Sequence, residues 1–156
     1  NEYELRGFGM DFGFTTDPTA IVECLKDKNN FYLKLHHYAP IDDPSTLYDI
    51  VKTICKEATI IADSSDKNTA GVHMVSDLRN KGLEIYPVKK FSGSVIYQID
   101  FMNQHKIHIV RDVNAKKEAE NYKYMTINGI KTNIPVDKYN HFWDASAYCC
   151  RTLFRG

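Results

Sequence analysis

Three strand-like segments, joined by short turns, open the chain, and the segments after them alternate between helix and strand. Residues 7–12, 19–26 and 31–38 are apolar or alternate between apolar and polar positions, and polar turn residues separate them. Three consecutive strands of this kind are expected to pair as an antiparallel meander. A meander followed by alternating helices and strands predicts an α/β domain with a mixed sheet flanked by helices.

The later elements are predicted from capping residues and from hydrophobic spacing. Asp43 and Pro44 supply a cap and a first-turn proline for a helix over 44–57, whose apolar residues recur at helical spacing. We expect strands at 59–63, 83–88 and 107–110, and helices at 68–80, from a cap at Ser92 or Ser94 to about 104, and at 139–153. Two strands over 122–127 and 130–134, joined by Asn128-Gly129, predict an extra β-hairpin before the last helix.

The length of 156 residues is that of one domain, so a single domain is expected over 1–156. The chain has no apolar run near the ~20 residues that span a bilayer, and its N-terminus does not resemble a signal peptide. It begins with Asn1 in front of a strand, which suggests a piece of a longer protein. The four cysteines form no CxxC pair, so we expect buried, reduced thiols and a reducing cytoplasm.

The formal net charge of zero conceals an imbalance between the two halves of the chain. Residues 1–80 hold 8 Lys or Arg against 13 Asp or Glu, and residues 81–156 hold 12 against 7. This distribution suits the first half to cations and the second half to phosphates, although surface charges of this kind are often only solvated.

Three aspartates stand in apolar surroundings. Asp11 ends the first strand, Asp63 ends the apolar run of residues 59–62, and Asp144 lies among aromatic and alanine residues of the last helix. A carboxylate in such surroundings is costly to desolvate, and a cluster of three repels itself unless divalent cations compensate. Alternatively, Asp11 can cap the turn that follows it, and Asp63 can cap the next helix.

Five short motifs follow one another along the chain, in the order Gly9-Met-Asp11-Phe-Gly13, Asp17-Pro-Thr-Ala20, Ala62-Asp63-Ser, Lys89-Lys-Phe-Ser-Gly-Ser94 and Asn140-His141-Phe-Trp-Asp144-Ala. As an ordered set they resemble the C-terminal nuclease domain of phage terminase large subunits. The resemblance covers almost the whole chain. It implies a ribonuclease H-like fold and a two-metal endonuclease that cuts concatemeric double-stranded viral DNA during genome packaging.

The resemblance also implies which residues form the catalytic site. Asp11, Asp63 and Asp144 match the metal-binding carboxylates, and Asp11 is our candidate for the ligand that bridges two ions. Three carboxylates suit Mg²⁺ or Mn²⁺ better than a thiol or imidazole cage does. His141 lies one helical turn before Asp144, so it can ligate an ion or orient a water molecule or phosphate, or it can simply pack in the interior.

Two regions are candidates for DNA contact. Lys89 and Lys90 precede a predicted helix start with Ser92 and Ser94, which places cations beside a helix N-terminus suited to a phosphate. The predicted hairpin carries Lys123 and Lys131, and it can touch DNA or gate the metal site. A solvated loop and a purely structural hairpin are the alternative interpretations.

The chain contains no GxxxxGK[ST] motif, so the ATPase domain of such a protein is expected upstream of this chain. The resemblance implies a terminase small subunit and a portal as partners, and action at the procapsid in the cytoplasm of an infected bacterium. We also expect no membrane association, since no apolar run could span a bilayer, and a monomeric isolated domain. Other enzymes of this fold, such as a junction resolvase or an integrase, and a packaging module that binds DNA without cutting it, are the alternatives.

Overall fold

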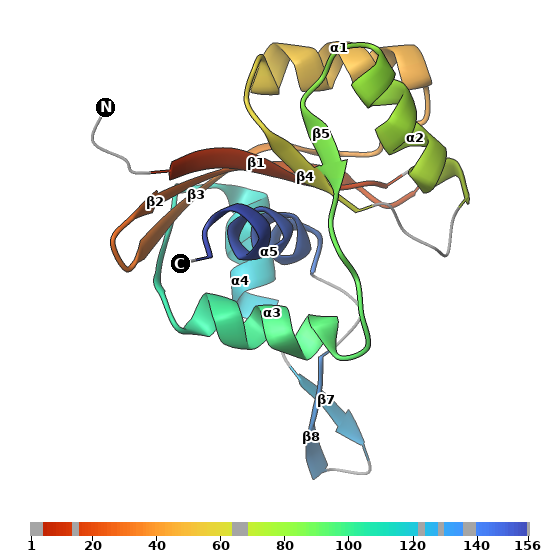
Figure 1. The fold of residues 1–156 in the computed structure, drawn as a ribbon. Coiled ribbons are helices and arrows are strands. Elements are labelled where there is room, and N and C mark those ends of the chain that lie inside the picture. The colour runs from red at the N-terminus through yellow and green to blue at the C-terminus, as the bar shows by residue number, and fades with distance from the viewer. Residues whose placement is uncertain are drawn as a thin grey trace.

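A mixed six-stranded sheet runs through the middle of the computed structural model (Figure 1). Its strands lie in the order β5-β4-β1-β2-β3-β6. They are β1 (Leu5–Asp11), β2 (Thr19–Asp27), β3 (Asn30–Ala39), β4 (Ile60–Ala62), β5 (Ile85–Pro87) and β6 (Lys106–Ile109). The structure describes residues 5–13, 16–63, 69–121, 124–127, 130–135 and 140–155.

The predicted meander is confirmed, because β1, β2 and β3 pair antiparallel. The other three strands join in parallel: β4 pairs with β1, β5 with β4, and β6 with β3. β1 therefore has an antiparallel neighbour on one side and a parallel neighbour on the other. This arrangement confirms the mixed sheet of the predicted ribonuclease H-like fold, and it leaves the carboxyl ends of β1 and β4 at the same edge.

Helices cover both faces of the sheet (Figure 1). α1 (Pro44–Cys55) and α2 (Thr69–Asn80) lie on one face, where they enclose a core that includes Phe8 and Met10 of β1. α5 (His141–Leu153) lies on the other face and buries Phe142 and Ala145 against β2 and β3. α3 (Ser94–Asn103) and α4 (Val113–Asn121) lie beyond α5.

The face of β1 that is turned to α5 carries glycine, because successive residues of a strand face opposite sides of the sheet. A Cβ atom added at Gly9 would lie 1.7 Å from the carbonyl oxygen of Ala145, and one added at Gly7 would lie 2.5 Å from Cδ1 of Leu153. The absence of side chains at these two positions lets the backbone of α5 approach the middle of the sheet.

The start of α1 follows the prediction, whereas the start of α3 does not. The Asp43 side chain accepts a hydrogen bond from Thr46 N at 3.3 Å and caps α1 as predicted. The residue that precedes α3 is Gly93, with φ of 83°, and α3 has no side-chain cap. The predicted cap at Ser92 or Ser94 was therefore wrong, because the chain enters this helix through a left-handed backbone conformation that suits glycine.

α4 was not predicted from the sequence. Its residues 113–121 include only Ala115 and Glu118 as buried positions, so no stripe of apolar residues marks a helix there. A capping signal was nevertheless present, because Asp112 Oδ1 accepts hydrogen bonds from Asn114 N at 2.8 Å and Ala115 N at 3.0 Å.

The predicted hairpin is present as a separate two-stranded sheet of β7 (Tyr124–Ile127) and β8 (Ile130–Pro135). It projects away from the layered body (Figure 1). Its predicted turn, Asn128-Gly129, and the first two residues of the predicted strand lie outside the described residues. The last helix begins at His141. Its predicted start at residue 139 lies in the range 136–139, which is also outside the described residues.

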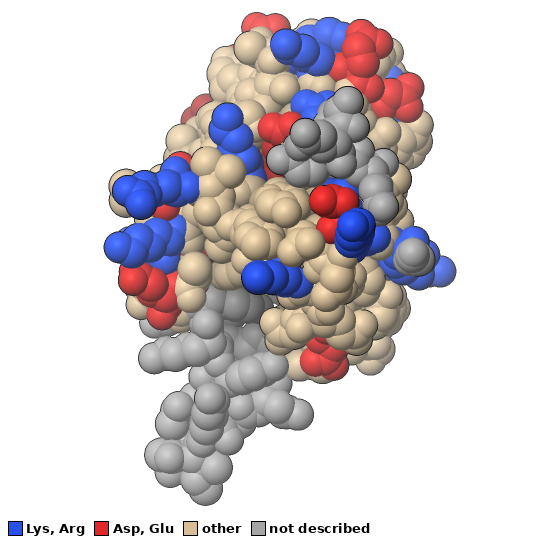
Figure 2. Space-filling model, turned by 90° about the vertical axis from the view of Figure 1, so that its left-hand side faces the viewer, with Lys and Arg blue, Asp and Glu red and all other residues tan. Residues whose placement is uncertain are grey.

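The four cysteines are buried and free, as predicted. Within the described residues, no helix is both long enough and apolar enough to cross a membrane. Figure 2 shows positive and negative side chains interspersed over one face of the molecule. On that face, the charge imbalance between the two halves of the sequence does not separate into one acidic and one basic area.

Candidate active site

Asp11 and Asp63 lie side by side because they follow paired positions of neighbouring strands. Met10 of β1 pairs in parallel with Ala62 of β4, and Asp63 N donates to Met10 O at 3.1 Å. Asp11 follows Met10 directly, and Asp63 follows Ala62 directly. In proteins with a sheet flanked by helices, the ligand-binding site often lies at the carboxyl ends of adjacent parallel strands.

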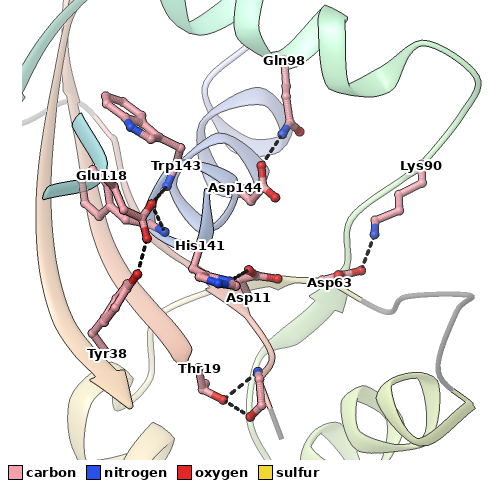
Figure 3. A network of polar contacts seen from close by, with 12 residues as sticks. Asp11, Thr19, Tyr38, Asp63, Lys90, Gln98, Glu118, His141, Trp143 and Asp144 are labelled. Carbon is pink, nitrogen blue, oxygen red and sulfur yellow. Dashed lines mark hydrogen bonds and ion pairs between the residues drawn. The ribbon is translucent and has the colours of Figure 1, made fainter. Parts of the chain in front are cut away.

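Asp144 reaches the same place from the first turn of α5. The close approach of α5 at Gly9 brings the start of the helix next to the end of β1. His141 is three residues before Asp144 and therefore lies on the same side of the helix. Figure 3 shows that the side chains of Asp11, Asp63, Asp144 and His141 lie in one neighbourhood, although they come from three elements far apart in the sequence.

Each carboxylate has a polar or positively charged neighbour of its own. His141 Nδ1 lies 3.1 Å from Asp11 Oδ2, and Gln98 Nε2 donates to Asp144 Oδ1 at 3.1 Å. Lys90 Nζ lies 2.6 Å from Asp63 Oδ1, yet this ion pair lacks the geometry of a hydrogen bond. Asp63 Oδ1 is therefore a buried oxygen that accepts no hydrogen bond from the described residues.

The proximity of the three carboxylates affects their protonation. Burial raises the pKa of Asp11, and the neighbouring charge of Asp63 raises it further, whereas the hydrogen bond with His141 opposes the shift. Burial raises the pKa of Asp144 well above its usual value, with additional contributions from Asp11 and Asp63. The hydrogen bond with Asp11 raises the pKa of His141, which favours its protonated form.

The chemistry of this cluster fits a divalent cation. Three aspartates supply the hard oxygen ligands that Mg²⁺ and Mn²⁺ prefer, and one buried oxygen accepts no hydrogen bond. Lys90 and His141 provide the positive charge that opposes the repulsion among the carboxylates. Within the described ranges, no three His, Cys, Asp or Glu side chains are gathered tightly enough to enclose an ion. Binding of one ion by all three aspartates would therefore require their carboxylates to move closer together.

We expect Asp144→Asn to stabilise the metal-free domain at neutral pH. Because the pKa of Asp144 is raised by folding, the folded state binds more protons than the unfolded state above the ordinary pKa of 3.8. The free energy of unfolding of the wild type therefore falls as the pH rises through this window, and the uncharged amide removes that contribution. Thermal unfolding in EDTA should show a variant–wild type difference that is small near about pH 4 and grows towards about pH 8. A difference that stays constant with pH would contradict this expectation.

Glu118 of α4 is a residue of this region that sequence reasoning missed. Its side chain is 1% exposed, and Oε1 accepts from Phe142 N at 2.8 Å and Trp143 N at 3.4 Å, while Oε2 accepts from the Tyr38 hydroxyl. The carboxylate thereby binds the free N–H groups at the start of α5, the turn that carries His141 and Asp144 (Figure 3). Burial raises the pKa of Glu118, and these hydrogen bonds partly offset the shift.

The predicted DNA contacts differ in position. Lys89, Lys90 and Ser92 are exposed on the segment before α3, whereas Ser94 is only 9% exposed, a poor position for its hydroxyl to reach a phosphate. The Lys90 ammonium points to Asp63, so this lysine lies at the edge of the acidic cluster (Figure 3). Lys123 lies outside the described residues, and Lys131 lies in β8, where only the backbone is described.

Comparison with known proteins points to one family. The family model for the "Terminase RNAseH like domain" matches residues 11–151. The nuclease domain of the large terminase g2p from bacteriophage SPP1, a crystal structure with bound Mn, is 30% identical, with a TM-score of 0.81. That match covers 96% of this chain and 87% of the SPP1 domain.

Two further structures share the fold at lower identity. A large terminase from a thermophilic bacteriophage is 20% identical, with a TM-score of 0.75, and the match covers 99% of this chain but 41% of that protein. The nuclease domain of the phage P22 large terminase is 14% identical, with a TM-score of 0.69 and coverage of 96% of this chain and 81% of that one. No curated protein matches the chain.

Proposed function

This chain belongs to the terminase RNase H-like family, as the nuclease domain of a phage terminase large subunit. We propose that it cuts concatemeric double-stranded viral DNA during genome packaging, and that it needs Mg²⁺ or Mn²⁺ to do so. The observation that carries the proposal is that Asp11 and Asp63, at the ends of β1 and β4, lie in one neighbourhood with Asp144 of the first turn of α5. The SPP1 nuclease domain, 30% identical over almost the whole chain, has Mn bound in its structure, which supports a metal requirement.

In this proposal Asp11, Asp63 and Asp144 would hold two divalent ions, and Asp11 is the candidate for the ligand common to both. A pair of divalent ions supplies activation of a water molecule and stabilisation of the departing 3′ oxygen. His141 orients the Asp11 carboxylate through its Nδ1, and this contact raises the pKa of His141. Lys90 offsets the negative charge at Asp63.

The DNA backbone would approach along the segment before α3. Lys89 offers positive charge and Ser92 offers a hydroxyl at exposed positions of this segment. Lys90 adds positive charge where it meets Asp63. Lys131 of the hairpin and Lys123, which lies outside the described residues, are further candidates for phosphate contact. Contacts of this kind position the duplex and carry little sequence information, so we expect cutting that tolerates many sequences.

The proposal includes the assembly in which this domain works. The chain corresponds to 41% of the length of the thermophilic-phage large terminase that it matches at 20% identity, which leaves room in such a protein for the upstream ATPase domain. The terminase small subunit and the portal are the proposed partners. The proposed place of action is the procapsid in the cytoplasm of an infected bacterium, and the isolated domain is expected to be a monomer.

Incubation of the domain with a supercoiled plasmid and Mn²⁺ tests this function. We expect nicked and then linear product, no cutting in EDTA, and comparable cutting of linear duplexes of unrelated sequence. A strong preference for a four-way junction or for transposon ends would point instead to a resolvase or an integrase. Binding of the plasmid without any cutting in Mn²⁺ or Mg²⁺ would show a packaging module that only binds DNA, and would reject the proposed activity.

A further inference from the structure

Gln98 of α3 is a buried amide that contacts a carboxylate of the proposed metal site. Its side chain is 5% exposed, so both ends of the amide need partners within the protein. Nε2 donates to Asp144 Oδ1 at 3.1 Å, and Oε1 accepts from Arg151 Nε at 3.1 Å. Gln98 therefore bridges two residues of α5 that lie two helical turns apart on the same face.

The orientation of this amide follows from the chemistry of its partners. A guanidinium carries only donors, so the oxygen of Gln98 must face Arg151. The NH₂ group then faces Asp144, whose Oδ1 accepts its hydrogen bond. Arg151 thereby fixes which end of Gln98 meets Asp144, and the amide donor in turn holds one oxygen of the Asp144 carboxylate.

Arg151 also holds the segment that carries Lys90. The side chain of Arg151 is largely buried, and Nη2 donates to the carbonyl oxygen of Lys89 at 2.8 Å. Its guanidinium packs 5.7 Å from the ring centre of Phe91 and 6.0 Å from that of Tyr97. The residue after Lys89 is Lys90, whose ammonium meets Asp63. The guanidinium of Arg151 is thus hydrogen-bonded both to Gln98, which contacts Asp144, and to the backbone of Lys89, next to Lys90.

We infer that Gln98 and Arg151, here called the Gln98–Arg151 bracket, are positioning residues that set the Asp144 carboxylate and the Lys90 ammonium for divalent metal binding. The inference rests on the proposed function, because it takes Asp144 as a metal ligand. The bracket touches neither substrate nor ion, and it acts through Asp144 and the Lys89–Lys90 segment. Hydrogen-bond partners behind a metal ligand typically contribute about 10-fold to 100-fold in metal affinity.

Calorimetric titration of the 156-residue domain with Mn²⁺ tests the bracket. We compare the wild type with Gln98→Met, Arg151→Met and the double variant, because methionine keeps the length of the side chain but removes its polar contacts. Each single variant should weaken Mn²⁺ binding by about 10-fold or more. The double variant should be little weaker than Arg151→Met, since both changes break the same chain of contacts.

Exposed residues close to the same helix ends provide matched controls. Gln104→Met, just after α3, and Arg155→Met, just after α5, replace side chains that are exposed. Both should bind Mn²⁺ as the wild type does. If Arg151→Met does not fold, Arg151→Lys replaces it, because an ammonium retains the charge but cannot bond Gln98 and Lys89 with the fork of a guanidinium.

The outcomes separate the bracket from the function on which it rests. We also measure the thermal unfolding of each variant. If Gln98 and Arg151 have a purely structural role, their variants will have a lower melting temperature but an unchanged Mn²⁺ affinity in the folded protein. If the wild type binds Mn²⁺ and Gln98→Met binds it with the same affinity, the inference about the bracket is wrong, whereas the proposed nuclease function still stands. Fully additive losses in the double variant overturn the coupling between the two residues. A wild type that binds no Mn²⁺ rejects the proposed function, and the bracket with it.

Discussion

Asp11→Asn should abolish Mn²⁺-dependent cleavage while the domain remains folded. Asp11 is the most buried of the three aspartates and contacts His141. It lies at the end of β1, the strand that pairs with both β2 and β4. The amide has nearly the same shape but carries no charge, so the change removes the shared ligand and leaves the packing in place. If the transition state loses several kcal/mol of stabilisation by the metal ions, the cleavage rate falls by about 10³-fold or more.

The measurement is a single-turnover cleavage rate at saturating Mn²⁺, with a calorimetric Mn²⁺ titration of the same preparation. Asp77→Asn on α2 is the control, because Asp77 is exposed and lies on the other side of the sheet from α5. The control should cut at the wild-type rate. Cutting by Asp11→Asn at the wild-type rate would end the assignment of this cluster as the catalytic site.

Gly9→Ala should be among the most damaging single changes to the stability of this domain. The added Cβ would lie 1.7 Å from the carbonyl oxygen of Ala145 and 2.6 Å from its carbonyl carbon. Both atoms belong to the backbone of α5, so no side-chain rotation can relieve the contact and the helix must move away from β1. Overpacking of this kind costs about 3 kcal/mol or more, which lowers the melting temperature of a domain of this size by roughly 6–12 °C.

Gly7→Ala on the same strand is the matched comparison. The contact there is with Cδ1 of Leu153, the end of a flexible side chain that can rotate away. We therefore expect a smaller loss of stability for Gly7→Ala. Gly9→Ala should also weaken Mn²⁺ binding in the protein that remains folded, because the displaced helix carries Asp144. Equal melting temperatures for the two variants would show that α5 is not held as closely to β1 as described.

The sequence predicted those parts of the fold that depend on short-range signals. The Asp43-Pro44 start of α1, the alternation in β2 and β3, and the position of Asp11 and Asp63 at strand ends are all local patterns. The meeting of the three aspartates was expected from the ordered motifs. Alternation of helix and strand after the meander was sufficient for the mixed sheet.

The contacts that support the site could not be predicted, because they join residues far apart in the chain. Nothing near Gln98 indicates that its partner is Asp144, 46 residues away, and nothing near Glu118 indicates that it caps the start of α5. Lys90 was predicted as a phosphate contact from its neighbours in sequence, and the structure places its ammonium on Asp63. The roles of Gly7 and Gly9 likewise depend on α5, which is more than 130 residues further along.

The proposed site draws on the beginning and the end of the described fold, since β1 supplies Asp11 and α5 supplies His141 and Asp144. A polypeptide emerges from the ribosome N-terminus first, so the strand with Asp11 is made long before its partners. During that interval the nascent chain holds only Asp11 and Asp63 of the trio. In the proposed function, the complete site would therefore form only after the last helix of the domain has been translated and has packed against the sheet.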